Sequence, residues 1–176
     1  EGKVMKVNVY SRSPKVKLYL NDKLIGEKET GKENYTATFD VPYEPGTLKA
    51  VNSKGKEEFV LKTAGAPAAI RLIADRSKIK ACKNDLSYVK IELVDKNGNV
   101  VPETSLPVKI ECTGKGTVIA GGNAAYADME SFRSLTPNTF RGKAIAIVQP
   151  DGEKGDIQVK VSAKGLEDAS IVITTY

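Results

Sequence analysis

The stretch Thr63-Ala64-Gly65-Ala66-Pro67-Ala68-Ala69 divides the chain and decides how the rest of it is interpreted. It carries neither a charge nor a large apolar side chain, so it has no means of forming a core. Gly65 widens the range of backbone conformations, and Pro67 favours an extended conformation at Ala66. Because residues on both sides alternate between apolar and polar, we interpret the stretch as a hinge between two β-domains, residues 1–64 and 65–176.

The first domain alternates apolar and polar side chains with a period of two, which is typical of strands that bury one face. Turn-forming residues at 21–23, 42–46 and 53–56 separate these strands, and no stretch has a helical period. The pattern predicts about six short strands in a small antiparallel sandwich. The residues expected to face inward are Met5, Val7, Val9, Val16, Leu18, Leu20, Tyr35, Ala37, Phe39 and Val41.

The second domain repeats the alternation, and we expect a β-sandwich of about seven strands. Asn97-Gly98 is the strongest hairpin signal in the chain. Residues 121–142 are irregular and long for a loop, which is typical of segments that are packed or functional. The in-phase apolar residues are Ile70 and Leu72, then Val89, Ile91 and Leu93, then Leu106, Val108, Ile110 and Cys112, then Ile157, Val159, Val161 and Ala163, and finally Ile171 and Ile173.

The composition indicates a globular protein. Hydrophobic residues make up 40% of the 176 residues, which is enough for a core and argues against disorder. No apolar run approaches the roughly 20 residues that span a bilayer, so we expect no membrane insertion. The chain starts at Glu1 without a recognisable signal peptide, so we expect it to be a piece of a longer protein.

Charge and the missing residue types exclude several functions. The net charge of +5 is spread over both halves, with lysines alternating with apolar residues, so the sequence predicts no nucleic-acid site. The chain has no His, which excludes Ser-His-Asp and Cys-His catalysis and the usual ligand of transition metals. We therefore predict no cofactor and no catalytic or metal site in these residues.

Asp95, Asn97 and Asn99 match the first three ligands of a calcium-binding loop. The match ends there, because Val100 and Leu106 stand where such a loop needs Gly and Glu. A hairpin turn explains the same residues, and we prefer that interpretation over calcium.

Two sets of residues bear on carbohydrate. Asp128 and Glu130 lie close together in the irregular segment, and a glycosidase needs two carboxylates about 5–10 Å apart. Charged residues make up 28% of the chain, however, so such pairs also arise by chance. Exposed tyrosines can stack on sugar rings, although Tyr is also a common strand residue. The candidates are Tyr10, Tyr19, Tyr43, Tyr88 and Tyr126.

The two cysteines, Cys82 and Cys112, differ in their expected environments. Cys112 is in the inward phase of its strand, whereas Cys82 lies beside the polar residues 83–85. We therefore expect two free thiols in preference to a disulfide. Two cysteines without His make no zinc site.

Several stretches together resemble a known family. Residues 16–23 (VKLYLNDK) and 41–50 (VPYEPGTLKA) resemble the immunoglobulin-like domain that follows the catalytic barrel in bacterial, often Bacteroides-type, family 2 glycoside hydrolases, the β-galactosidases. The second half is similar to the next C-terminal domain of these enzymes, an invasin-type bacterial immunoglobulin-like module. That likeness rests on residues 64–72 (AGAPAAIRL), 85–95 (DLSYVKIELVD), 97–102 (NGNVVP) and 130–132 (ESF).

The resemblance implies an all-β fold of two consecutive immunoglobulin-like sandwiches, without catalytic residues of its own. In the family, the catalytic pair of Glu residues belongs to a TIM barrel that this chain lacks. The expected partner is therefore the TIM-barrel domain of the same parent chain, with weak glycan contact as a further option. The family also implies a location in the periplasm, at the cell surface or outside the cell.

Three functions remain open at this point. The chain is a non-catalytic accessory region of a β-galactosidase-like hydrolase, a carbohydrate-binding module, or a stalk of a surface adhesin, since invasin-like repeats also build stalks. We expect the first. The sequence does not distinguish packing on the barrel from spacing it.

Overall fold

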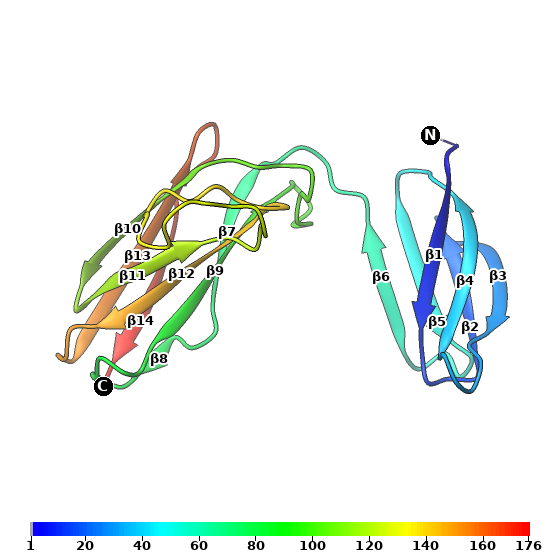
Figure 1. The fold of residues 1–176 in the computed structure, drawn as a ribbon, viewed down its shortest axis with the longest axis horizontal. Helices are drawn as coiled ribbons and strands as arrows, with labels where there is room; N and C mark the ends of the chain where they lie inside the picture. Colours follow the sequence, from blue (N-terminus) through cyan, green and yellow to red (C-terminus); the bar gives the residue numbers. More distant parts are fainter. Residues whose placement is uncertain (1) are drawn as a thin grey trace. The chain divides into compact units, whose positions relative to one another are not determined.

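The computed structural model describes residues 2–176, and its regular elements are all β-strands (Figure 1). The chain divides into two compact units, residues 1–63 and 64–176, one residue from the boundary that the sequence predicts. The predicted all-β class with consecutive sandwiches is confirmed. Among the described residues, no helix is long and apolar enough to cross a membrane.

The first unit is a sandwich with layers of unequal size. One layer holds four strands in the order β3-β2-β5-β6, and the other holds only β1 and β4. All neighbours are antiparallel. The strands are β1 (Val4–Tyr10), β2 (Lys15–Leu20), β3 (Lys23–Glu29), β4 (Thr36–Pro42), β5 (Thr47–Asn52) and β6 (Glu58–Lys62).

The core of this unit lies where the period-two pattern places it. The buried residues come from β2 and β4, and they are Val16, Leu18, Leu20, Ala37, Phe39 and Val41. Two predicted inward residues are exposed instead. Tyr35 is 48% exposed because it precedes β4, in a turn with φ +50°, and Met5 is 50% exposed on β1 although its phase is right.

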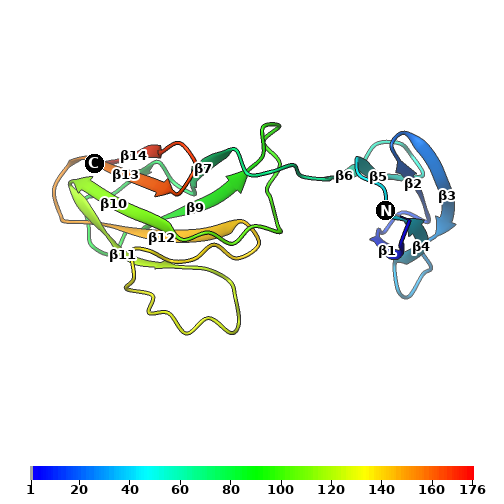
Figure 2. The same cartoon turned by 90° about the horizontal axis from the view of Figure 1, so that it is seen from above.

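The second unit is a sandwich of two four-stranded layers, visible from above in Figure 2. The strand orders are β11-β12-β9-β7 and β10-β13-β14-β8, and only β8 and β14 pair in parallel. The strands are β7 (Ala69–Ala74), β8 (Lys78–Ile79), β9 (Ser87–Val94), β10 (Val108–Gly114), β11 (Gly116–Gly122), β12 (Lys143–Pro150), β13 (Gly155–Ala163) and β14 (Ala169–Thr175).

The core of the second unit follows from inward residues of both layers. Val89, Ile91, Ile157 and Val159 are fully buried, as their phase predicts. The chain passes from one layer to the other between β10 and β11, where Gly114 has φ +95°. A side chain at Gly114 would also collide with the backbone of Asp156, so this crossover requires glycine.

Candidate functional site

The irregular segment remains the candidate site, although it is shorter than predicted. Gly121 and Gly122 belong to β11, so the segment that connects β11 with β12 comprises residues 123–142. It is the largest excursion from the sandwich in Figure 2, drawn in yellow-green below β11. Its length therefore calls for a structural explanation before a functional one.

This connecting segment closes the side of the sandwich between β10 and β11. Gly121 N donates to Phe132 O at 2.7 Å, and Ile110 N donates to Leu135 O at 2.8 Å. Val108 N donates to Pro137 O at 3.0 Å. These hydrogen bonds pair backbone groups on the outer edges of β10 and β11, one edge strand from each layer, which would otherwise be left unpaired. The length of the segment thus has a structural purpose.

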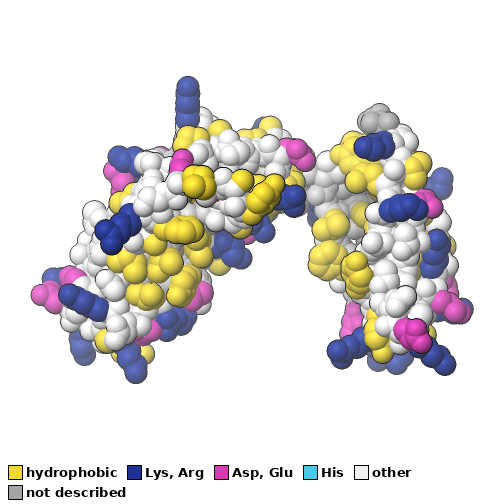
Figure 3. Space-filling model, in the orientation of Figure 1, with side chains coloured by type: hydrophobic (Ala, Val, Ile, Leu, Met, Phe, Trp, Pro, Cys, Tyr) yellow, Lys and Arg dark blue, Asp and Glu magenta, His cyan; other side chains and the backbone are white. Residues whose placement is uncertain are grey.

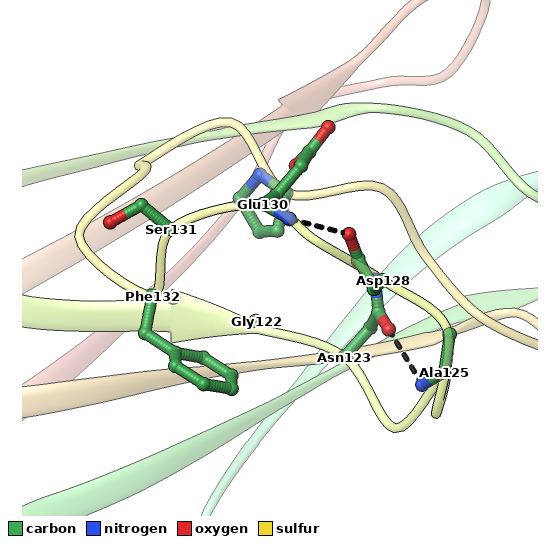
Figure 4. Close-up of a pocket in the computed structure, with 9 residues that line it drawn as sticks. Gly122, Asn123, Ala125, Asp128, Glu130, Ser131 and Phe132 are labelled. Atoms are coloured by element: carbon green, nitrogen blue, oxygen red, sulfur yellow. Dashed lines mark hydrogen bonds between the residues drawn. The ribbon is translucent and has the colours of Figure 1, made fainter.

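The two candidate carboxylates lie in this segment and hold its own turns together (Figure 4). Asp128 accepts from the amide nitrogen Nδ2 of Asn123 at 2.5 Å and from the backbone N–H of Glu130 at 2.9 Å. Glu130 accepts from Nδ2 of Asn138 at 3.1 Å. Figure 4 shows the Glu130 side chain extending away from the Asp128 carboxylate. The two groups therefore do not converge on one point, as an acid and a nucleophile must.

The cavity beside these carboxylates is small. Its volume is about 30 Å³, and Gly122, Asn123, Ser131 and Phe132 contribute to its lining. A cavity of this volume holds only about one or two water molecules, whereas binding sites for small molecules have volumes of about 300–1,000 Å³. It offers no room for a sugar ring.

A wider, open hollow of about 620 Å³ follows β10 and β13. The carboxylate on its lining, Glu111, accepts from Nζ of Lys109 at 2.7 Å, and that hydrogen bond lowers the pKa of Glu111. Burial raises the pKa of the Cys112 thiol in the same hollow, which keeps it protonated. The hollow thus holds neither a general acid nor an activated nucleophile.

Carboxyl groups elsewhere show the same direction of change. Among the residues that the structure describes, each carboxyl group with a clearly shifted pKa has it lowered: Asp85, Asp95 and Glu111. A glycosidase needs the opposite shift in its general acid. The described part of the chain also holds no cluster of three metal-ligating acidic, Cys or His side chains.

The remaining sequence candidates are scattered. Cys82 is exposed and Cys112 is partly buried, and neither forms a disulfide in the described structure. The tyrosines come from both units; Tyr126 is fully exposed on the connecting segment, and Tyr10 is 73% exposed on β1. Two further exposed residues near Tyr126 in the sequence were not among the predicted carbohydrate candidates, namely Met129 at 95% and Phe132 at 70% exposure.

Comparison with known proteins identifies the family. A family model described as glycoside hydrolase family 2 C-terminal domain 5 matches residues 70–172. The chain belongs to the C-terminal domains of glycoside hydrolase family 2. Residues 2–59 match a second model, described as a domain of unknown function (DUF4982). The resemblance predicted from the sequence is thus confirmed.

Similar proteins are much longer than this chain. A β-galactosidase of Bacteroides ovatus is 32% identical over 94% of this chain, and the match covers 20% of that protein. A β-glucuronidase of Formosa agariphila is 28% identical over 94% of this chain and 17% of its own length. A solved family 2 member from Bacteroides cellulosilyticus is 38% identical with a TM-score of 0.94, covering 100% of this chain and 23% of that structure. This chain therefore spans about a fifth of its relatives.

Proposed function

We propose that these residues form a non-catalytic accessory region of a β-galactosidase-like glycoside hydrolase, which packs on or spaces the catalytic barrel of the same chain. One observation carries the proposal. The carboxylates that could act as a catalytic pair, Asp128 and Glu130, are engaged in hydrogen bonds within their own loop, beside a cavity too small for a sugar. The hydrolytic site then belongs to the larger part of the parent protein.

The comparisons support this division of labour. The chain corresponds over its whole length to 23% of a family 2 hydrolase, and over 94% of its length to 20% of a β-galactosidase. Retaining hydrolysis needs two carboxyl groups about 5–5.5 Å apart around a bound sugar, together with a raised pKa on one of them. The cavity beside Asp128 and Glu130, about 30 Å³ in volume, has no room for such a sugar. The proposal also puts the parent protein in the periplasm, at the cell surface or outside the cell.

Hydrolysis of a nitrophenyl β-galactoside by the purified chain tests the proposal. We expect no release of nitrophenol above the buffer blank, whereas the protein made from the complete reading frame should turn the substrate over. The same assay with a nitrophenyl β-glucuronide covers the activity named for one relative. Saturable turnover by the 176-residue chain, lost in Asp128→Ala or Glu130→Ala, would contradict the proposal.

Carbohydrate binding is a second candidate function, favoured by the exposed rings on the connecting segment. Tyr126 is fully exposed and Phe132 is 70% exposed, and Asn123 and Glu130 supply polar groups nearby. If this surface binds sugars, a galactoside oligosaccharide titrated into the chain should produce a saturable heat signal. Tyr126→Ala should abolish the signal, since stacking on an aromatic ring drives such binding. Tyr10→Ala, at an exposed ring in the other unit, is the matched control. Absence of binding at millimolar sugar would exclude this candidate.

A further inference from the structure

The first unit has an apolar inner face that its second layer leaves uncovered. Inner residues can be followed across the large layer by register: Leu18 on β2 pairs with Ala50 on β5, which pairs with Phe59 on β6. Burial falls along this row, from Leu18, which is 1% exposed, to Phe59, which is 69% exposed. The next row ends in the same way at Leu61, which is 55% exposed.

The small layer shows a matching decrease in burial. Val41 on β4 is 4% exposed, and its antiparallel partner Met5 on β1 is 50% exposed. In both layers, therefore, the inner side chains become more exposed toward the same side of the unit, the side bounded by β1 and β6. Interiors of folded domains are close-packed, so a progressive decrease on both layers indicates an unfinished core.

Phe59 and Leu61 belong to the inner face and not to the solvent face. Their partner strand β5 contributes Ala50 and Leu48 to the core at the positions opposite them. The intervening residue Val60 pairs with Lys49, whose ammonium group lies 5.5 Å from the ring centre of Tyr19 on the outer face. Figure 3 shows hydrophobic side chains gathered along the β6 edge of this unit.

The edge of β1 beside this face is also free. Within residues 2–176, β1 pairs with β4 alone. Tyr43 N donates to Lys3 O at 2.9 Å, which sets the alternation: odd-numbered residues of β1 direct their backbone groups to β4. Lys6, Asn8 and Tyr10 therefore direct their N–H groups to the open side. A free edge beside an uncovered apolar face is a ready site for another strand.

Only a strand added at β1 would complete this core. β4 contacts β3 across the sandwich, so β1 lies toward the β5 and β6 side of the large layer. A strand about 4.8 Å beyond β1 would then lie across from β6 and cover Phe59 and Leu61. A strand added beyond β6 would only widen the large layer.

We propose that a further β-strand, from a part of the same glycoside hydrolase chain outside these 176 residues, pairs with the free edge of β1 and packs apolar side chains on Met5, Phe59 and Leu61. The inference rests on the proposed accessory function. The relatives carry this region within chains of which it is only about a fifth, so a covering segment is available in the same polypeptide. A tethered segment is present at high effective concentration, which favours it over a separate partner.

Hydrogen exchange tests the pairing directly. We expect the amides of Lys6, Asn8 and Tyr10 to exchange at least about tenfold more slowly in the protein made from the complete reading frame than in the 176-residue chain. The amide of Val60, on the β6 edge that the added strand does not pair with, is the internal control. Equal rates for the β1 amides in both proteins would overturn the proposal, as would a reading frame that encodes no further segment.

A substitution on β6 tests the packing. In the complete protein, Phe59→Asp should lower the melting temperature by about 4 °C or more, whereas Val60→Asp should lower it by less. Without a covering strand, Val60→Asp should be the more destabilising of the two, because Val60 is 37% exposed whereas Phe59 is 69% exposed. In the 176-residue chain Phe59→Asp should be nearly neutral, which also shows that the variant folds.

The same experiments distinguish two alternatives, namely a second copy of the chain on this face and a face that nothing covers. If a second copy of the chain covers this face, the 176-residue chain will sediment as a dimer and Phe59→Asp will make it a monomer, which overturns the proposal. If nothing covers the face, Phe59→Asp will be nearly neutral in the complete protein and will lower the melting temperature less than Val60→Asp does, which also overturns the proposal. Neither result changes the expected outcome of the nitrophenyl β-galactoside assay on the 176-residue chain, so the two proposals fail separately.

Discussion

Asp95 shows what an acidic residue in this chain does. Its carboxylate accepts from the backbone N–H groups of Gly65, Asn97 and Asn99 at 2.9, 2.9 and 2.8 Å. The side-chain amide of Asn99 donates a further bond at 3.0 Å. Donors surround the oxygens that a calcium ion would need, so the structure supports the turn over the calcium loop. Local sequence predicts the bonds within the turn, but not the one to Gly65, thirty positions away.

These bonds make the stability of the second unit depend on pH. The Gly65 N–H, followed by the Asn99 side chain, lowers the pKa of Asp95 from 3.8 to about 2. A group whose pKa is lowered by folding contributes stability above its unfolded pKa and loses it as the pH falls through the folded value. We therefore expect the melting temperature of this unit to fall between pH 4 and pH 2.

Asp95→Asn tests this dependence. The variant should be less stable than the wild type at pH 7, because it removes the charge and one acceptor oxygen, and the difference should shrink as the pH falls from 4 to 2. Circular dichroism melts at each pH measure both effects. Asn97→Ser, in the same turn, keeps the carboxylate and should keep the dependence. A constant difference at all pH values would contradict the assignment.

At the scale of elements, period-two alternation predicted those strands that bury large side chains on one face only. β2 and β13 are of this kind, and their inward residues were correct. The predicted inward residues of β9 were also correct, although this strand buries Glu92 and Val94 on its other face as well. β12 was not located because its inward residues include the small Ala144 and Ala146, while Ile145 and Ile147 face outward. β11 was not located because its register shifts between Val118 and Ala120, which breaks the alternation.

The Asn97-Gly98 signal predicted a turn correctly but overstated the hairpin. A single β-bridge, between Val94 at the end of β9 and Val100, closes the turn, and no second strand follows to form a hairpin with β9. Arg71 explains why the turn nevertheless has a fixed position, since it donates to Gly98 O at 2.9 Å and to the buried Glu92 at 2.6 Å. These hydrogen bonds join Arg71 on β7 to β9 and to the turn after it. The alternation of residues within one stretch of sequence cannot predict them.

The connecting segment shows the same limit at the candidate site. Its length and irregularity were visible in the sequence, and so were Asp128 and Glu130. Its bonds to β10 and β11 were not, because they depend on which strands lie at the edges of the two layers. The sequence therefore located the segment correctly but left its structural purpose undetermined.

At the scale of the whole molecule, the two units differ in how much core they contain. The buried apolar cluster of the first unit has 6 residues, and that of the second has 15. Small domains bury a smaller fraction of their surface and are correspondingly less stable. The open side of the first unit adds to this difference.

We therefore expect the first unit to unfold at a lower temperature than the second in the 176-residue chain. Two core substitutions assign the transitions seen by calorimetry. Phe39→Ala, in the first core, should destabilise the lower transition by about 3–5 kcal/mol, and Ile91→Ala, in the second, should destabilise the upper one by about 2–5 kcal/mol. Each substitution leaves the other core intact, because no residue belongs to both clusters. A single transition shifted equally by both variants would contradict independent unfolding, and a lower transition that responds only to Ile91→Ala would reverse the order.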